Sequence, residues 1–109
     1  MLVNLINKHI AEINKLCQTH YVFELYLFGS MANENFTDKS DIDFLVSFKG
    51  VEPQEYFDNY MDLKERFELL FNRNIDLLEK QTIKNPILQL SIDQNKKFIY
   101  GTANPKIAI

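Results

Sequence analysis

Residues 27–46 read LFGSMANENFTDKSDIDFLV, and this stretch decides the fold. It begins inside an apolar and aromatic segment, residues 21–28, which stops at Gly29-Ser30. After ten further residues a second apolar segment starts at Asp41 and continues to Phe48. Apolar, aromatic and β-branched runs bounded by turn residues are typical of β-strands. The sequence therefore predicts two strands, joined by a connection with room for only a short helix and a loop.

The rest of the chain alternates between helical and strand-like patterns. Apolar side chains recur at three- and four-residue steps along two segments, as in helices packed on a core. Proline is favoured in the first turn of a helix and asparagine as the cap before it. The predicted elements are a helix over residues 2–18, a helix from Pro53 to Asn72, a strand over 74–79, a helix from Asn85-Pro86 to about Asp93, and an edge strand over 97–100. This order predicts an α/β layer domain.

Length and composition limit what this domain can be. The chain has 109 residues, of which 46% are hydrophobic, which suits one folded domain and excludes a disordered or fibrous chain. We assign the domain to residues 1–101 and treat residues 102–109 as a tail. The single cysteine, Cys17, excludes an internal disulfide framework. No apolar run is as long as a membrane span and the N-terminus lacks a secretion signal, so we expect a cytosolic protein.

Three aspartates carry the chemistry that we expect of this domain. Asp41 and Asp43 flank Ile42, and because side chains alternate along a strand they project from the same face. Two neighbouring carboxylates repel each other, and Mg²⁺ is a natural partner because it binds one or two carboxylates together with substrate phosphates. Asp76 lies in another apolar strand and completes the group if the two strands are neighbours. Three such carboxylates can hold two metal ions about 4 Å apart for an in-line phosphoryl displacement.

Gly29 and Ser30 supply the other half of the predicted site. Glycine after a strand lets the backbone turn sharply and approach a ligand closely. The start of the following short helix offers free N–H groups and a positive dipole end, which favour phosphate. The hydroxyl of Ser30 adds a donor, and the same hydroxyl could also cap that helix. We therefore expect the phosphates of a triphosphate on this side of the pocket and metal ions on the other.

Together these motifs resemble the nucleotidyltransferase fold of the DNA polymerase beta superfamily. The resemblance rests on Gly29-Ser30, the ten residues that follow, Asp41-Ile42-Asp43, and Asp76. It extends from about Phe23 to Gly101. Within the superfamily, the chain resembles the minimal nucleotidyltransferases (MNT family), which consist of this domain alone. The resemblance implies a small mixed β-sheet of three to four strands flanked by helices.

The resemblance also implies a reaction. A nucleoside triphosphate, expected to be ATP, donates a nucleoside monophosphate to a hydroxyl, two Mg²⁺ ions assist, and pyrophosphate is released. The implied roles are metal ligands for Asp41 and Asp43, a third ligand and general base for Asp76, and contacts to the β- and γ-phosphates for Gly29 and Ser30.

One position departs from the family pattern. Many members have arginine directly after Gly29-Ser30, whereas this chain has Met31. The change removes a cation from near the triphosphate. Lys39, just before Ser40, is the residue that could compensate, and we include it as a nucleotide-binding candidate.

The acceptor has to come from outside this small domain. Twelve basic and fifteen acidic residues give a net charge of −3, which disfavours direct binding to nucleic acid. By resemblance, minimal nucleotidyltransferases pair with small helical HEPN proteins, many of them RNases, and act as antitoxins by moving AMP from ATP to a tyrosine of that toxin. We expect this function, in a hetero-oligomer or a homodimer. The alternatives are a transferase for a small molecule, such as an aminoglycoside, and a non-catalytic module that neutralises its partner by binding.

Overall fold

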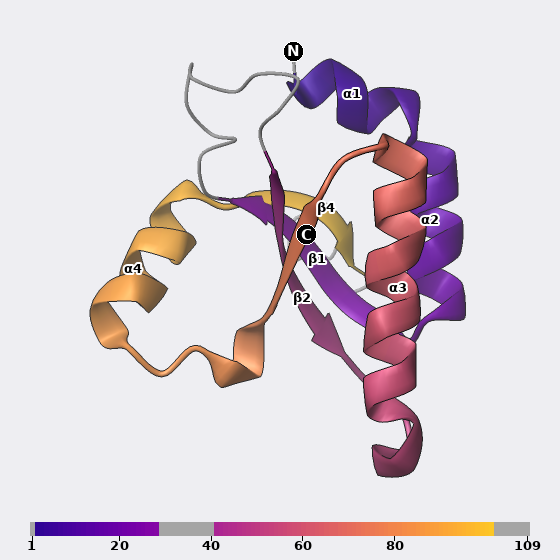
Figure 1. Ribbon diagram of the computed structural model, residues 1–109. Helices are drawn as coiled ribbons and strands as arrows, with labels where there is room; N and C mark the ends of the chain where they lie inside the picture. The colour runs from indigo at the N-terminus through magenta and orange to yellow at the C-terminus, as the bar shows by residue number, and fades with distance from the viewer. Residues whose placement is uncertain (1, 29–40, 102–109) are drawn as a thin grey trace, which may run out of the picture.

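The computed structural model describes residues 2–28 and 41–101 (Figure 1). Its helices are α1 (Leu2–Lys8), α2 (Ile10–Thr19), α3 (Tyr56–Phe71) and α4 (Pro86–Asn95), with short 3₁₀ turns at Pro53–Glu55 and Lys80–Thr82. Its strands are β1 (Val22–Phe28), β2 (Ile42–Phe48), β3 (Ile75–Glu79) and β4 (Lys97–Gly101).

The four strands form one mixed sheet in the order β3-β2-β1-β4. Strand β1 runs antiparallel to both β2 and β4, whereas β2 and β3 are parallel. A parallel pair needs a long crossover between its strands, and α3 provides it. The expected α/β class, with a small mixed sheet flanked by helices, is confirmed.

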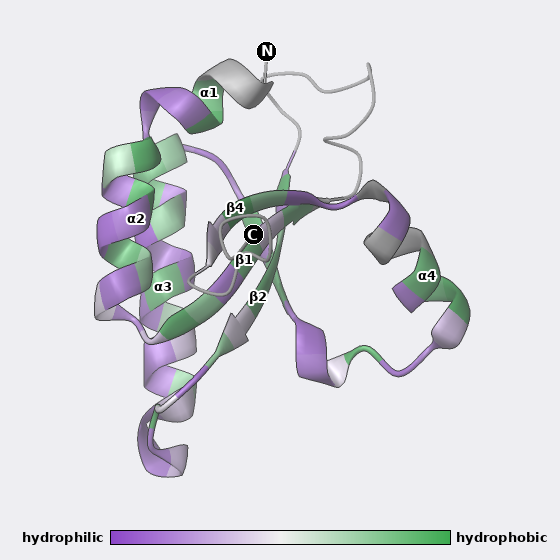
Figure 2. Cartoon of the chain, turned by 180° about the vertical axis from the view of Figure 1, so that it is seen from behind, coloured by the Kyte–Doolittle hydropathy of each residue, from purple (hydrophilic) through white to green (hydrophobic). Residues whose placement is uncertain are grey.

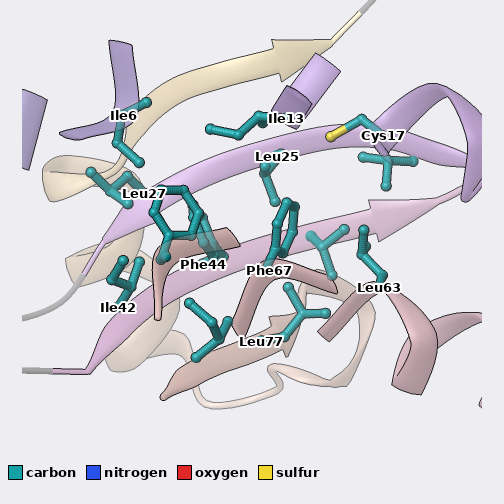
Figure 3. Packing of buried hydrophobic residues seen from close by; sticks show 14 of the residues in the cluster. Ile6, Ile13, Cys17, Leu25, Leu27, Ile42, Phe44, Leu63, Phe67 and Leu77 are labelled. Atoms are coloured by element: carbon teal, nitrogen blue, oxygen red, sulfur yellow. The ribbon is translucent and has the colours of Figure 1, made fainter. Parts of the chain in front are cut away.

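Helices α2 and α3 pack side by side on one face of the sheet (Figure 1). Figure 3 shows the residues that fill the space between: Ile13 and Cys17 of α2 and Leu63 and Phe67 of α3 against Leu25, Phe44 and Leu77 of the sheet. The rings of Phe44 and Phe67 have centroids 5.0 Å apart. Burial of these apolar side chains fixes which face of each strand turns toward the helices.

The other side of the sheet, away from α2 and α3, is called the outer face here. Along β2, the residues Ile42, Phe44 and Val46 are buried toward the helices. Because side chains alternate, the outer face of β2 carries Asp43, Leu45 and Ser47.

The first predicted helix, over residues 2–18, is wrong as a single element. The chain leaves helical geometry at His9 (φ −111°, ψ 15°), which separates α1 from α2. The His9 ring packs edge-on against Phe71, with centroids 5.4 Å apart, and Ile6 and Ile13 still both reach the core. The apolar spacing is therefore the same on both sides of the break, so the sequence pattern does not reveal it.

Several predicted boundaries also move, by one to three residues. Tyr21, expected in the first strand, lies in the turn before β1 with a positive φ of 61°. Asp41, expected as the first residue of the second strand, lies immediately before β2. Pro53 opens a 3₁₀ turn that leads into α3, instead of opening the α-helix itself.

Helix α4 stands apart from the other helices, across the sheet from α2 and α3 (Figure 2). The predicted start is confirmed, because the Asn85 side-chain oxygen accepts hydrogen bonds from the backbone N–H groups of Ile87 (2.9 Å) and Leu88 (3.3 Å). Its side chains Ile87, Leu88 and Leu90 are exposed, with 79% of Ile87 and 58% of Leu90 accessible to solvent. Within residues 2–28 and 41–101, no helix is both long and apolar enough to cross a membrane.

Candidate active site

Asp43 and Asp76 are neighbours across two parallel strands. The register of β2 and β3 pairs Ile42 with Ile75, Asp43 with Asp76 and Phe44 with Leu77. The residues on either side of Asp43 and Asp76 are buried toward the helices: Ile42, Phe44, Ile75 and Leu77. Because side chains alternate along a strand, Asp43 and Asp76 both project on the outer face. Adjacent strands lie about 4.8 Å apart. The strand order therefore brings Asp76 beside Asp43, and its role as a metal ligand stays a prediction.

Asp41 extends this pair by one step toward the start of β2. It is exposed and stands two residues before Asp43, at the edge where the strand begins. That edge is pinned by the backbone N–H of Ile42, which donates to the carbonyl of Asn74 at 3.1 Å. Strands β2 and β3 thus start at the same end of the sheet, and all three aspartates lie at that end.

The donor set suits a hard cation. Asp43 is half-buried and Asp76 is exposed, so both can be approached by a ligand from the outer face. Among the described residues, no three acidic, histidine or cysteine side chains are close enough to form a complete metal site. Mg²⁺ does not require one, because it commonly binds one or two carboxylates and completes its shell with water and substrate phosphates.

Helix α3 holds β3 in place on both sides of Asp76. In a parallel pair, alternate residues direct their backbone groups to the partner strand, and Asn74 is directed to β2. Ile75 and Leu77 therefore present their backbone groups at the free edge of β3. The carboxylate of Glu68 accepts a hydrogen bond from the Ile75 N–H at 3.3 Å, and the Tyr60 hydroxyl donates to the Leu77 carbonyl. Asp76 lies between these two contacts.

We call Tyr60 and Glu68, which hold the edge of β3 on either side of Asp76, the clamp. Both side chains have shifted pKa values. Burial raises the pKa of Tyr60, Lys64 lowers it, and the Asp76 carboxylate raises it. The hydrogen bond from Lys64, at 3.1 Å, is the main reason that the pKa of Glu68 is lowered, and the Ile75 N–H adds to it. Tyr60 therefore stays a hydrogen-bond donor at neutral pH, and Glu68 stays an ionised acceptor.

A row of apolar side chains lies next to the aspartates on the outer face. Leu45 is paired with Leu78 on β3 and with Tyr26 on β1, and Tyr26 is paired with Phe98 on β4. The rings of Tyr26 and Phe98 meet edge to face, with centroids 5.9 Å apart. Phe98 is 46% exposed. The carboxylates thus lie next to an apolar part of the outer face.

Three predicted nucleotide-binding residues, Gly29, Ser30 and Lys39, lie outside the described residues, as does Met31. Their roles stay predictions. Strand β1 ends at Phe28, whose partner across the sheet is Asp43, so the chain leaves β1 beside the aspartates.

Sequence reasoning missed the clamp. Helical spacing places Tyr60 on the apolar face of this segment and Glu68 on its polar face, and indicates nothing more. Their contacts depend on how α3 lies against the edge of β3, and no local pattern shows that.

The chain is similar in sequence to known proteins over most of its length. The family model described as "Polymerase beta, Nucleotidyltransferase" matches residues 11–104. The "Putative protein adenylyltransferase MJ1379" of Methanocaldococcus jannaschii is 30% identical over 102 residues, which cover 84% of this chain and 99% of that protein.

Two solved structures show similar folds. One is a toxin-antitoxin complex with AMP-PNP, with a TM-score of 0.66 and 20% identity, covering 91% of this chain and 78% of that one. The other is the tri-AMPylated Shewanella oneidensis HEPN toxin in complex with MNT antitoxin, with a TM-score of 0.61 and 18% identity, covering 94% of this chain and 77% of that one.

Proposed function

The chain belongs to the polymerase beta nucleotidyltransferase family, whose model spans residues 11–104, and from that premise we propose that it transfers AMP from ATP to a tyrosine hydroxyl of a partner HEPN RNase and thereby acts as an antitoxin. The observation that carries the proposal is the pairing of Asp43 with Asp76 on the outer face of the sheet. Two carboxylates held side by side at an accessible strand end are suited to metal-assisted phosphoryl transfer.

The relatives support the donor and the partner. MJ1379 carries the name of a protein adenylyltransferase, and the chain matches nearly its whole length. One structurally similar complex was solved with AMP-PNP, and another contains an AMPylated HEPN toxin bound to its MNT antitoxin. By analogy, ATP is the donor, and a HEPN protein is both the partner and the source of the acceptor.

The three aspartates share one task in this proposal, and Asp76 has a second. Asp41, Asp43 and Asp76 would hold Mg²⁺, which when bound neutralises phosphate charge and makes the acceptor hydroxyl more acidic. Asp76 is exposed on β3, the edge strand of the sheet, so an incoming acceptor can reach it. We assign it the role of accepting the hydroxyl proton. Gly29, Ser30 and Lys39 are proposed to contact the β- and γ-phosphates.

The reaction then balances as an in-line displacement. The acceptor oxygen forms a bond to the α-phosphorus of ATP, and its proton passes to the carboxylate of Asp76. The bond from the α-phosphorus to the bridging oxygen breaks, and pyrophosphate leaves with that oxygen. A tyrosine hydroxyl has an ordinary pKa of about 10, so removal of its proton is the step that requires a base.

Intact-mass spectrometry of the partner tests the proposal. The chain is incubated with its HEPN partner, ATP and Mg²⁺, and each transferred AMP should add about 329 Da to the partner. Asp43→Asn should reduce the rate by about 100-fold or more, because it removes a ligand while keeping the shape of the side chain. Asp58→Asn, the same change on the exposed start of α3, is the matched control.

Three outcomes would contradict the proposal. They are an unmodified partner with the wild-type chain, transfer by Asp43→Asn at the wild-type rate, and AMP on a small molecule but never on the partner. An unmodified partner that is still neutralised by the triple variant of Asp41, Asp43 and Asp76 would identify the chain as a non-catalytic antitoxin.

A further inference from the structure

The outer face also carries a lysine that the family motif does not include. Lys96 lies between α4 and β4, and its Nζ sits 4.4 Å from the centroid of the Tyr26 ring. We propose that Lys96 is a further cation, besides the candidate Lys39, that binds the phosphates of the nucleotide donor. This inference rests on the proposed function, since it assumes that a nucleoside triphosphate binds at the aspartates.

The strand register places Lys96 in line with the aspartates. Strand β4 pairs with β1 so that Phe98 faces Tyr26 and Lys97 faces Leu27. One further step brings Lys96 level with Phe28, which is the partner of Asp43 in β2. Asp43 and Lys96 thus stand at the same level of the sheet, two strands or roughly 10 Å apart. A triphosphate whose α-phosphate lies at the aspartates can extend across this gap.

The contact with the Tyr26 ring places the ammonium group of Lys96 on the outer face of the sheet. Leu25 and Leu27 are buried toward α2 and α3, so the Tyr26 ring between them projects on the outer face. Tyr26 is paired with Leu45 on the neighbouring strand. It is therefore the diagonal cross-strand neighbour of Asp43, at a distance of about 7–8 Å. A cation held over this ring shares the surface on which the metal ligands stand.

The charges of the site create a need for such a cation. A triphosphate is strongly anionic, and it has to approach three aspartates on a chain of net charge −3. Metal ions offset the charge at the aspartates, whereas the far end of the triphosphate needs its own partner. An ammonium group beside a phosphate forms a charge-assisted hydrogen bond, which is stronger than one between neutral groups.

Other lysines of the described sheet are less well placed. Lys97 is the register partner of Leu27 and lies with Ile6 and Asn7 of α1, so it belongs to the opposite face. Lys80 lies beside Glu24, with 3.8 Å between Nζ and the carboxylate, so the position of Glu24 gives its place on the sheet. Glu24 is opposite Ser47, at the end of the sheet away from the aspartates.

The aromatic contact also prepares the lysine for binding. A free lysine side chain loses considerable rotamer entropy when it is fixed by a ligand. The Tyr26 face, itself packed against Phe98, holds Nζ over the outer face before the nucleotide arrives. Part of the ordering cost is therefore met in the free protein.

Binding of AMP-PNP and of AMP, each with Mg²⁺ and measured by calorimetry, tests the assignment. Lys96→Ala should weaken AMP-PNP binding by about 10- to 100-fold, the value of one charge-assisted hydrogen bond. Its effect on AMP should stay within about twofold, because AMP lacks the β- and γ-phosphates. Lys96→Arg should restore most of the affinity, since arginine also binds phosphate and stacks on aromatic rings.

Lys97→Ala is the matched control, because it removes the same charge one residue away on the other face. The inference is overturned if Lys96→Ala and Lys97→Ala bind AMP-PNP equally well, or if Lys96→Ala weakens AMP and AMP-PNP by the same factor. If the wild-type chain binds neither nucleotide, the proposed function fails instead. Circular dichroism of each variant checks that the fold is intact.

Discussion

At the scale of single residues, the site depends on how firmly Asp76 is held. Asp76 lies on an edge strand, where backbone groups on one side have no neighbouring strand. Glu68 and Tyr60 of α3 bind those groups at Ile75 and Leu77, one on each side of Asp76. Because these contacts occupy backbone groups of the edge strand, they also oppose its pairing with a strand of another molecule. Tyr60 and Glu68 are therefore positioning residues, since they act on Asp76 through the backbone.

Replacing Tyr60 by phenylalanine removes one half of this clamp. We expect Tyr60→Phe to lower the free energy of unfolding by about 1 kcal/mol, the usual net value of one hydrogen bond. Urea denaturation measures this change. AMP transfer should also slow, with kcat affected more than the KM for ATP, because the donor phosphates are not held by Asp76 alone.

The control is Tyr21→Phe, at a tyrosine that is 49% exposed in the turn before β1. The clamp is refuted if Tyr60→Phe unfolds at the same urea concentration as this control and transfers AMP at the wild-type rate.

Much of the residue-level chemistry could be predicted. The spacing of Asp41 and Asp43 on one strand fixes their common face, and a charged residue inside the apolar run around Asp76 indicates a special position. Tyr60, Glu68 and Lys96 could not be found in this way. Their roles come from the packing of α3 on the edge of β3 and of β4 beside β1, and the sequence does not specify either neighbour.

At the scale of elements, α2 and α3 are joined by a polar contact at one end. The His20 Nε2 donates to the carboxylate of Asp62 at 2.6 Å, and the Asn59 side chain donates to the His20 carbonyl at 2.8 Å. His20 is half-buried, and these contacts make it part of the packing between the two helices. The contact ties the end of α2 to the first half of α3.

The pH dependence of stability should report this contact. The hydrogen bond from His20 lowers the pKa of Asp62, with a smaller contribution from Arg66. A lowered carboxyl pKa stabilises the fold above the ordinary aspartate pKa of about 3.9, and this stability is lost as the pH falls toward the folded-state value. Asp62→Asn should therefore cost about 0.5–1 kcal/mol at pH 7, because the pair is partly exposed, and much less near pH 3.

Denaturation of wild type and variant at both pH values gives the comparison. Glu65→Gln, at an exposed site of the same helix, should cost little at either pH. A cost of Asp62→Asn that is as large at pH 3 as at pH 7 would show that the carboxylate is not responsible.

The elements themselves differ in how well the sequence predicts them. The strands and α3 follow from apolar runs and helical spacing, and Asn85-Pro86 marks the start of α4. The break at His9 could not be predicted, because Ile6, Ile10 and Ile13 keep helical spacing across it. The His9 ring contact with Phe71 brings together two segments far apart in the chain.

At the scale of the whole molecule, the sheet separates two functions. The face under α2 and α3 forms the core (Figures 1 and 3). By strand register, the outer face carries the aspartates, the Tyr26–Phe98 pair and Lys96. The layer order was predictable from the alternation of helices and strands. The use of the outer face follows only from the strand order, which brings β3 and β4 to opposite sides of the central pair.

In the proposed function, Asp43 and Asp76, with Asp41, bind metal ions together with the nucleotide. Mn²⁺ can replace Mg²⁺ at such oxygen-ligand sites, and its binding can be counted by electron paramagnetic resonance. In saturating AMP-PNP, corrected for Mn²⁺ held by free nucleotide, the wild-type chain should bind two Mn²⁺ ions, and Asp76→Asn should bind one fewer or bind the second far more weakly. Wild-type stoichiometry and affinity in Asp76→Asn would contradict the account.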